Sequence, residues 1–392
     1  MRLVAFPYHD WRKADVEGNR WRDAHILEGL GRHAGVETLL VVDRPTSLAE
    51  RMIRRSPATA RGRRVGSLKV GRAQATLTEV AAKTIVLDIA VPDLIGPVRD
   101  RYRWWFSVFE DESVLKAIEW AVASQPGSHW SSIAWTPTVA PAIERLNPRR
   151  MVFDSLDNWL LHPQLRRYAD RAAPAYQALL RRADAVFVSA PRSRDALRQW
   201  DDEIEVLPNG VSPELFEAPT TRPADLPDQP IVGYAGSIGA RIDEDLVRSV
   251  ARGLPGVQFV FIGQALDRSV VERLGKEPNV NYLGDRHYSD VPAYIRSFDV
   301  AWIPHAIGAG ESGGDPIKMY EYWAAGREVV ATRIDGLDRW ADRLHLVTTA
   351  AEAVSVIQGQ LSGSVPPLRA TVPPDRTWEA MTQVFVDRLG EG

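Results

Sequence analysis

The stretch GGDPIKMYEYWAAGREVVAT, residues 313–332, is the segment that decides the fold and the function of this chain. It predicts a loop, an amphipathic helix and a buried strand, because Pro316 suits a first helical turn and Gly326 suits a helix end. Lys318 and Glu321 lie one turn apart and so point the same way. A cation and an anion presented together at a helix start suit a ligand that carries phosphates and sugar hydroxyls. The alternative is an exposed salt bridge that contributes little.

The same strand-and-helix alternation extends over the whole chain in both directions. Short apolar runs predict strands in the first half at residues 2–7, 36–42, 83–90, 132–137, 150–156, 184–190 and 204–210, with helices between several of them, for example 20–33 and 138–146. A second series of predicted strands occupies 231–238, 257–263, 280–284, 299–304, 328–332 and 344–349. Such alternation predicts an α/β fold of parallel sheets with helices on both faces.

A chain of 392 residues is too long for one ordinary core, and two domains are expected. The Pro-rich stretch 216–230 is interpreted as a linker. We place a first Rossmann-like domain at 1–205 and a second at 206–375, and expect the amphipathic tail 376–392 to form a helix, packed back on the first domain. Doubly wound sheets bind ligands outside the carboxyl ends of their strands, so the two domains should face a ligand cleft.

Composition excludes several classes of protein. The chain is 45% hydrophobic and 25% charged, as in soluble globular proteins, and its net charge of −3 gives no general reason to expect nucleic acid. Without cysteine there is neither a disulfide framework nor a thiolate metal site. No window approaches the roughly 20 apolar residues that span a bilayer. We expect a cytoplasmic protein that contacts the inner face of the membrane peripherally.

Two segments have a composition that suits a membrane surface. Residues 51–72 contain eight Lys or Arg and no Asp or Glu, which suits an anionic membrane surface or substrate, although a solvated loop is the simpler interpretation. Residues 99–109, RDRYRWWFSVF, mix three arginines with five aromatic residues. That mixture suits a lipid head group or a carbohydrate acceptor, and the edge of a core helix would look similar.

A glycine-containing loop in the second half is a candidate phosphate site. GYAGSIGAR, residues 233–241, follows a predicted strand and precedes a helix. Gly236 lets a phosphate approach the backbone closely, and Arg241 adds a fixed cation. The loop is not the dinucleotide-binding fingerprint, and a strand-to-helix turn needs glycine in any case. His305, after a later strand, is a candidate for the phosphate or the sugar, or a structural histidine.

The first half offers an anion site and candidate bases. Gly18, Asn19 and Arg20 precede the first long helix and so form a plausible anion or sugar site. His25, within that helix, faces either the cleft or the core. Asp154 and Asp157 leave a strand three residues apart. Either can serve as a base or order sugar hydroxyls, and helix capping by Asp157 or Asn158 is the structural alternative.

These residues together resemble the GT-B glycosyltransferases, in particular family 4 ("group 1") and a bacterial subgroup near the teichuronic-acid and exopolysaccharide transferases. EVLPNGVSPELF, from Glu205, resembles the crossover between the domains, and VGYAGSI the opening of the donor-binding domain. The motifs from Asn281 and from Pro316 resemble its donor-binding half. VFDSLDNWLLHP, from Val152, resembles the first domain of the subgroup. The resemblance covers nearly the whole chain.

The resemblance implies roles for individual residues. Glu321 accepts hydrogen bonds from the donor ribose, Lys318 and Arg241 hold the diphosphate, and residues 18–20 cap the donor from the other domain. The donor-binding set is then Gly18, Asn19, Arg20, Gly236, Ser237, Arg241, His305, Asp315, Lys318, Met319 and Glu321, and the catalytic candidates are Asp154, Asp157 and His25. The resemblance also implies no metal and no cofactor beyond the nucleotide diphosphate-sugar co-substrate.

One departure from the family pattern concerns the donor sugar. The family commonly has two glutamates separated by seven residues, and the first of them engages the transferred sugar. Here the position eight before Glu321 is Gly313, and the nearest acid upstream of that glycine is Glu311. The identity of the sugar therefore stays open, as does the stereochemical course, for which the family implies retention of the anomeric configuration.

The function predicted from the sequence is transfer of a hexose-type sugar from a nucleotide diphosphate-sugar to a hydroxyl acceptor in polysaccharide, glycolipid or natural-product glycosylation. A GT-B-like nucleotide-sugar epimerase is one alternative, which the aromatic and basic segment 99–109 disfavours because it suits an acceptor. A non-catalytic carbohydrate- or nucleotide-binding relative is the other alternative.

Overall fold

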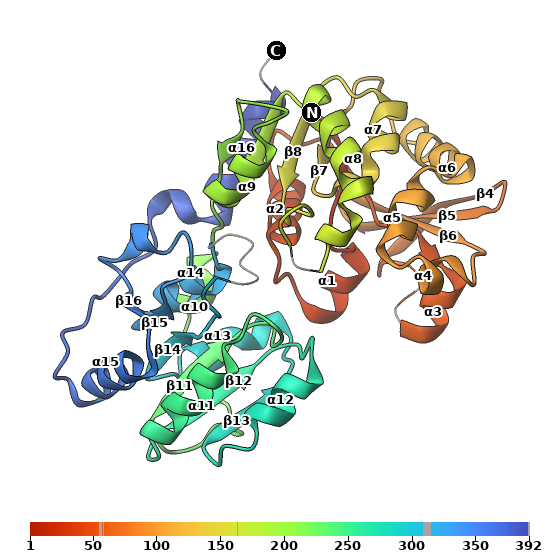
Figure 1. Cartoon of the computed structure of the whole chain (residues 1–392). Helices are drawn as coiled ribbons and strands as arrows, with labels where there is room; N and C mark the ends of the chain where they lie inside the picture. Colours follow the sequence, from red (N-terminus) through yellow and green to blue (C-terminus); the bar gives the residue numbers. More distant parts are fainter. Residues whose placement is uncertain (55–56, 58, 163, 309–314, 391–392) are drawn as a thin grey trace. The chain divides into compact units, whose positions relative to one another are not determined.

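The structure is a computed structural model that describes residues 1–54, 57, 59–162, 164–308 and 315–390. The chain forms two compact α/β domains (Figure 1). The first comprises Met1–Leu207 and Glu379–Gly392, and the second comprises Pro208–Trp378. The chain thus passes between them two residues after the predicted boundary. Among the described residues, no helix combines the length and the apolar character that crossing a bilayer requires.

The first domain is built on one large sheet. Its strand order is β10-β9-β8-β7-β1-β2-β6-β5-β4, and the short β3 pairs with β6. The strands are β1 Arg2–Phe6, β2 Thr38–Val42, β3 Thr46–Ser47, β4 Arg63–Val70, β5 Ala73–Ala81, β6 Thr84–Val91, β7 Ser131–Ala134, β8 Met151–Ser155, β9 Ala185–Val188 and β10 Glu205–Val206. The central strands are apolar runs with almost every residue buried, as expected of a parallel sheet covered on both faces.

Helices connect these strands. They are α1 Trp11–Glu17, α2 Arg22–Arg32, α3 Leu48–Arg54, α4 Gly96–Arg99, α5 Tyr102–Phe109, α6 Glu112–Ala123, α7 Ala140–Leu146, α8 Ala169–Arg182 and α9 Pro191–Leu197. The C-terminal helix, α16 Trp378–Gly390, returns to this domain from Glu379 onward. Phe385 of α16 is fully buried, and its ring lies 6.0 Å from that of Trp135 and 5.3 Å from that of Phe187.

One edge of the first sheet differs from the prediction. β4 and β5 form an antiparallel hairpin, and β5 pairs antiparallel with β6, so the sheet is not purely parallel. β4 covers part of the basic stretch 51–72 that was interpreted as a solvated loop, and that interpretation is wrong for this part. β4 is the edge strand and is mostly exposed, so it needs no apolar run and gives no hydrophobic signal.

The second domain has a six-stranded parallel sheet in the order β13-β12-β11-β14-β15-β16. Its strands are β11 Ile231–Ala235, β12 Gln258–Ile262, β13 Val280–Gly284, β14 Val300–Ile303, β15 Val329–Thr332 and β16 His345–Val347, and each lies within a predicted run. Its helices are α10 Pro213–Glu217, α11 Glu244–Gly253, α12 Arg268–Leu274, α13 Val291–Ile295, α14 Ile317–Ala324 and α15 Ala350–Ser362. Sequence order reverses between the neighbours β11 and β14, which marks a topological switch point.

The predicted linker 216–230 is part of the second domain rather than a connection between domains. Phe216 is fully buried in the core of this domain, and Leu226 is nearly so. Asp225 accepts a hydrogen bond from Tyr294 and pairs with Arg286. The proline-rich composition therefore indicates an irregular segment, and this segment lies against the domain. Composition alone does not reveal the side-chain contacts that hold it there.

Candidate functional site

The candidate site lies at the carboxyl edge of the second sheet, where the chain leaves β11 and β14. The loop after β11 lies against the residues that follow β14: the amide of Asp243 donates to the carbonyl of Pro304 (2.9 Å), and that of Ala306 donates to the carbonyl of Arg241 (2.8 Å). These hydrogen bonds hold the predicted phosphate loop beside His305. Helix α14, which carries Lys318 and Glu321, begins near the same switch point, where doubly wound sheets bind ligands.

Gly236 brings the backbone up against Lys318. Its φ is +149°, a conformation that favours glycine. A Cβ atom here would lie 2.7 Å from Cε of Lys318 and 3.1 Å from its Nζ. Only glycine therefore allows the ammonium group to sit next to this turn, and the structure brings these two predicted donor-binding residues together.

Lys318 lies among like charges. Burial, and then the nearby Arg241, lower its pKa to about 7, whereas Glu321 acts in the opposite direction. The ammonium nitrogen is 5.1 Å from the centre of the Tyr234 ring. Among the described residues, no carboxylate lies within ion-pair distance of Lys318 or Arg241. An anion bound here would supply the negative partner that Lys318 and Arg241 lack among the described residues.

His305 lies beside these two residues. We call Lys318, Arg241 and His305 together the cationic cluster, in which the lysine and the arginine carry the charge. The side chain of His305 is buried, and its Nε2 lies 3.4 Å from the hydroxyl of Tyr234. Burial, followed by Lys318 and Arg241, lowers its pKa well below the usual value, so the imidazole is neutral. The same tyrosine hydroxyl donates to the carbonyl of Ser237 (3.0 Å). Tyr234 thereby ties the loop to the histidine.

Glu321 is buried and oriented by a tyrosine. Its Oε1 accepts a hydrogen bond of 2.8 Å from the hydroxyl of Tyr288, which follows β13 in the 3₁₀ turn Tyr288–Asp290. Within the described chain, no ion pair joins Glu321 to Lys318, so the alternative of an exposed salt bridge is not what the structure has. Sequence reasoning missed Tyr288, because only the fold brings it to α14.

Two members of the predicted donor-binding set have side chains that bond or pack within the second domain. Asp315 is buried: its carboxylate accepts from Tyr320 (2.7 Å) and Arg339 (2.6 Å) and from the amide of Asn209. It fixes the entry to α14. The side chain of Met319 is fully buried in the core. Both side chains are thus engaged within the domain, and their part in donor binding stays a prediction. Glu311 and Gly313, which bear on the first glutamate of the family pattern, lie outside the described residues.

In the first domain, residues 18–20 lie between α1 and α2, at the predicted helix start. Gly18 has φ +81° and ends α1. The Asn19 amide donates to Glu28 (2.9 Å), and the Arg20 guanidinium donates to the carbonyl of Glu17 (2.9 Å). The polar side chains thus already bond within their own domain, and their part in donor binding stays a prediction.

Two of the three catalytic candidates are inaccessible. His25 is 4% exposed, and burial lowers its pKa to about 3, so it is a neutral core histidine. Asp154 is 0% exposed: its carboxylate accepts from Arg22 Nε (2.6 Å) and from Trp135 Nε1 (2.9 Å). Neither side chain reaches a substrate, and both catalytic assignments are corrected. Asp157, after β8, is half-buried and keeps its place as a candidate.

A histidine that the sequence did not single out stands at the carboxyl end of β1. Nδ1 of His9 lies 3.0 Å from Oδ1 of Asp23, and its ring stacks on Trp21 at 4.4 Å. Against the effect of burial, His9 lowers the pKa of Asp23, which keeps the carboxylate ionised. If Nδ1 carries the proton, Nε2 is left as an acceptor able to take a proton from a hydroxyl. The sequence did not indicate this pair, because His9 and Asp23 are far apart along the chain.

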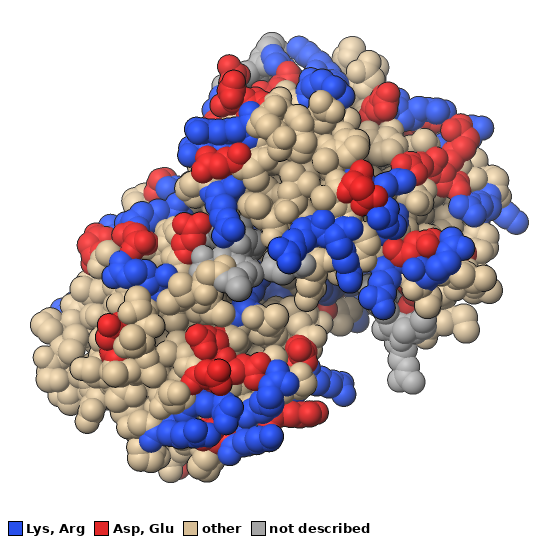
Figure 2. Space-filling model, in the orientation of Figure 1, with Lys and Arg blue, Asp and Glu red and all other residues tan. Residues whose placement is uncertain are grey.

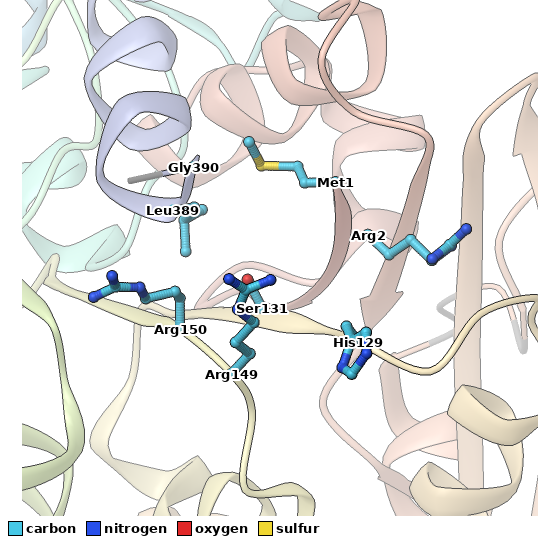
Figure 3. Close-up of a pocket in the computed structure, with 8 residues that line it drawn as sticks. All are labelled: Met1, Arg2, His129, Ser131, Arg149, Arg150, Leu389 and Gly390. Carbon is cyan, nitrogen blue, oxygen red and sulfur yellow. The ribbon is translucent and has the colours of Figure 1, made fainter. Parts of the chain in front are cut away.

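A cavity of about 220 Å³ lies elsewhere in the first domain. Figure 3 shows its lining: Met1, Arg2, His129, Ser131, Arg149, Arg150, Leu389 and Gly390. It opens at the start of β1 and β7, the amino edge of the sheet, whereas doubly wound sheets bind at the carboxyl edge. Arg2 pairs with Glu37, and Arg150 with Asp184. In the described part of the chain, no group of three or more His, Asp or Glu is placed to hold a metal ion.

Comparisons with known proteins agree with this geometry. Residues 229–357 match the family model for glycosyl transferases group 1. TuaH of Bacillus subtilis (strain 168), a protein assigned to teichuronic acid biosynthesis as a glycosyltransferase, is 22% identical over 268 residues, which cover 64% of this chain and 67% of TuaH.

Solved structures share the whole architecture. The trehalose-6-phosphate synthase OtsA superposes with a TM-score of 0.66 at 11% identity, covering 100% of this chain and 99% of OtsA. HepE from Anabaena, in complex with UDP-glucose, gives 0.57 at 14% identity, covering 99% and 95%. The predicted GT-B fold and the predicted glycosyltransferase function are confirmed, and the comparisons give no support to an epimerase.

Proposed function

We propose that this glycosyltransferase moves a hexose-type sugar from a nucleotide diphosphate-sugar to a hydroxyl acceptor, in polysaccharide, glycolipid or natural-product glycosylation. The observation that carries the proposal is the cationic cluster of Lys318, Arg241 and His305 around the turn at Gly236. Among the described residues no carboxylate pairs with Lys318 or Arg241, and burial together with Arg241 lowers the pKa of Lys318. A diphosphate would neutralise these positive charges, and a nucleotide diphosphate-sugar carries one next to its sugar.

The roles of the residues follow from their positions. Lys318 and Arg241 hold the diphosphate and stabilise the negative charge that develops on it as the glycosidic bond breaks. Gly236 admits the phosphate close to the backbone, since no Cβ stands in its way. Glu321, oriented by Tyr288, accepts hydrogen bonds from the ribose hydroxyls. The neutral imidazole of His305 offers one hydrogen bond to a phosphate or sugar oxygen.

The proposed reaction needs neither a metal nor a cofactor beyond its donor, because Lys318 and Arg241 supply the positive charge that a divalent cation would otherwise bring. A direct test compares turnover in EDTA with turnover in added Mg²⁺ or Mn²⁺. Equal rates are expected, and activity that EDTA abolishes and a metal restores would overturn this part of the proposal.

We propose that transfer retains the anomeric configuration. The resemblance to family 4 supports retention, and so does the shared fold of trehalose-6-phosphate synthase, an enzyme of glycosyl transfer with retention. Inversion would need a base to deprotonate the acceptor hydroxyl, and the His9–Asp23 pair is the arrangement that would supply one. Proton NMR of the anomeric centre in the first product formed decides between the two courses.

The acceptor and its setting are proposed at the level of chemical class. A glycan, a glycolipid or a small molecule with a free hydroxyl fits the aromatic residues near the carboxyl edge of the first domain, where Tyr8 and Trp105 lie 6.2 Å apart. A glycolipid acceptor resides in a bilayer, and we therefore place the reaction in the cytoplasm at the inner face of the membrane.

Donor binding is measured by calorimetry with UDP-, GDP- and dTDP-glucose, starting with UDP-glucose because HepE was solved with it. We expect one of these to bind, and binding to be lost in Lys318→Ala but kept in Lys276→Ala, an exposed lysine of the same domain. No binding of any nucleotide sugar would overturn the proposal. Binding without transfer to any acceptor and without hydrolysis of the donor would favour the non-catalytic alternative.

A further inference from the structure

An apolar surface is displayed on the first domain, apart from the donor site. Leu94, Ile95 and Val98 are 58%, 66% and 62% exposed, and we call these three residues the apolar tip. They lie in and just before α4, which contacts α3. In α3, Leu48 is 42% and Met52 77% exposed. Helices α3 and α4 lie side by side at the periphery of this domain (Figure 1).

The apolar tip is held in place by hydrogen bonds to the side chain of Asp93. Oδ1 of Asp93 accepts from the amides of Ile95 (3.1 Å) and Gly96 (2.8 Å), and Oδ2 accepts from Nε1 of the buried Trp104 (2.8 Å). A Cβ at Gly96 would lie 2.3 Å from Asp93 Oδ2. A turn anchored this firmly, with its apolar side chains facing water, is arranged to present them to something.

Three arginines follow the tip along the chain. Arg99 and Arg103 are well exposed, and Arg101 is exposed in a left-handed conformation with φ +50°. Arg99 pairs with Asp100, and Arg103 pairs with Asp170. The neighbouring α3 leads into the stretch 51–72, which contains eight Lys or Arg and no Asp or Glu. On the face that Figure 2 draws, acidic and basic groups are interspersed.

From these features we propose that the apolar tip and its arginines dock the first domain on an anionic bilayer surface. Apolar side chains at a small projecting turn enter the interface between head groups, whereas arginines pair with lipid phosphates while their stems remain in apolar surroundings. A protein partner would instead need about 800 Å² of matched surface on each side. The charges suit lipids such as phosphatidylglycerol.

The location of the tip links docking to the reaction. β6, which ends at Val91, runs parallel to β2 and β1, so the tip follows the carboxyl edge of the first sheet. His9 and Tyr8 follow β1 at the same edge. Docking would therefore hold that edge near the bilayer, where a lipid-linked acceptor presents its hydroxyl. This deepens the proposed membrane setting and rests on it.

Vesicle co-sedimentation tests the proposal without donor or acceptor. Wild type should bind vesicles that mix phosphatidylcholine with phosphatidylglycerol and bind pure phosphatidylcholine weakly, and added salt should weaken the binding. The triple variant Leu94→Ser, Ile95→Ser, Val98→Ser should lose about tenfold or more in vesicle affinity. Leu266→Ser, which alters a 64% exposed leucine of the second domain, is the matched control and should bind as wild type does. Arg99→Gln with Arg101→Gln and Arg103→Gln should remove the preference for anionic vesicles.

The outcomes separate docking from catalysis. All the substituted side chains are exposed, so the melting temperature and nucleotide-sugar binding should match those of wild type. Failure of wild type to bind anionic vesicles, or equal binding by the triple variant, overturns the docking proposal while leaving the transferase assignment standing. If wild type is instead a dimer that the triple variant separates, with vesicle binding unchanged, the tip is a protein interface and the proposal is wrong.

Discussion

The carboxyl edges of the two sheets treat charge in opposite ways. In the first domain, buried charges meet opposite charges: Arg22 bonds to Asp154, and Arg12 to Asp43 and Asp88. In the second domain Asp315 also pairs with Arg339, but Lys318 and Arg241 of the cationic cluster have no carboxylate within ion-pair distance among the described residues. A charge neutralised within the protein is part of its structure, whereas charges that repel one another in the free protein are arranged for a ligand.

The largest expected effect comes from breaking a neutralised pair. Asp154→Ala removes the carboxylate that bonds to the buried Arg22, and the loss should lower the free energy of unfolding by about 3–5 kcal/mol. Denaturant titration measures it. Glu119→Ala, which breaks the exposed pair with Arg145, should lose far less stability, because water and salt screen that pair. If the two variants lose similar stability, the first-domain charges are not structural in the sense proposed.

Loss of a cation from the cationic cluster should affect donor affinity rather than stability. Lys318→Ala removes a half-buried cation from among like charges, so the stability of the free protein should hold or rise. Donor affinity should fall by roughly 10- to 100-fold, because a charge-assisted hydrogen bond to phosphate is lost. Melting temperature and calorimetry on the same sample measure both quantities. A large loss of stability with unchanged donor affinity would reverse the comparison between the two edges.

Proton linkage at Lys318 gives an intermediate effect. Its pKa of about 7 in the free protein lies below the ordinary value, and a diphosphate favours the charged form, so donor binding raises it. At pH 7 about half the molecules must take up a proton on binding, and the required form becomes scarcer as pH rises. Donor affinity should fall roughly fivefold from pH 7 to pH 8.

Calorimetry in buffers of different ionisation enthalpy measures this proton uptake. Lys318→Arg is the control, because an arginine stays charged throughout this range and should give a flat profile. A wild-type affinity that is level between pH 7 and pH 8 would show that the lysine is already charged in the free protein.

The sequence predicted the second domain better than the first. All six strands of its sheet are apolar runs, and the turn at Gly236 and the helix with Lys318 and Glu321 follow from local patterns. The sequence did not predict the hairpin β4–β5, because an exposed edge strand needs no apolar run. The sequence also did not predict the contacts of His9 with Asp23 and of Glu321 with Tyr288. The partners in each pair are distant in the chain and meet only in the fold.

The burial of the wrong candidates has a related cause. Asp154 and His25 have the residue types of a catalytic base, and their positions by a strand end and near a helix start are the usual ones. Residue type and approximate position do not reveal whether a side chain faces solvent or the core. A shift of one residue along a strand, or of about two along a helix, moves the side chain to the opposite face. Asp154 and His25 face inward.

The last expected effect, no larger than that of pH, concerns the orientation of Glu321. Tyr288→Phe removes the hydroxyl that donates to Oε1 of Glu321 but leaves the carboxylate in place. One hydrogen bond is worth about 1 kcal/mol, so donor affinity should fall about fivefold, less than in Lys318→Ala. The hydroxyl of Tyr294 bonds to Asp225 instead, so Tyr294→Phe should lose comparable stability without a change in donor affinity.

Unchanged donor affinity in Tyr288→Phe together with a large loss of affinity in Glu321→Ala would mean that the carboxylate binds the ribose without help from the tyrosine. If Glu321→Ala also binds the donor normally, the second domain holds its ligand by charge alone.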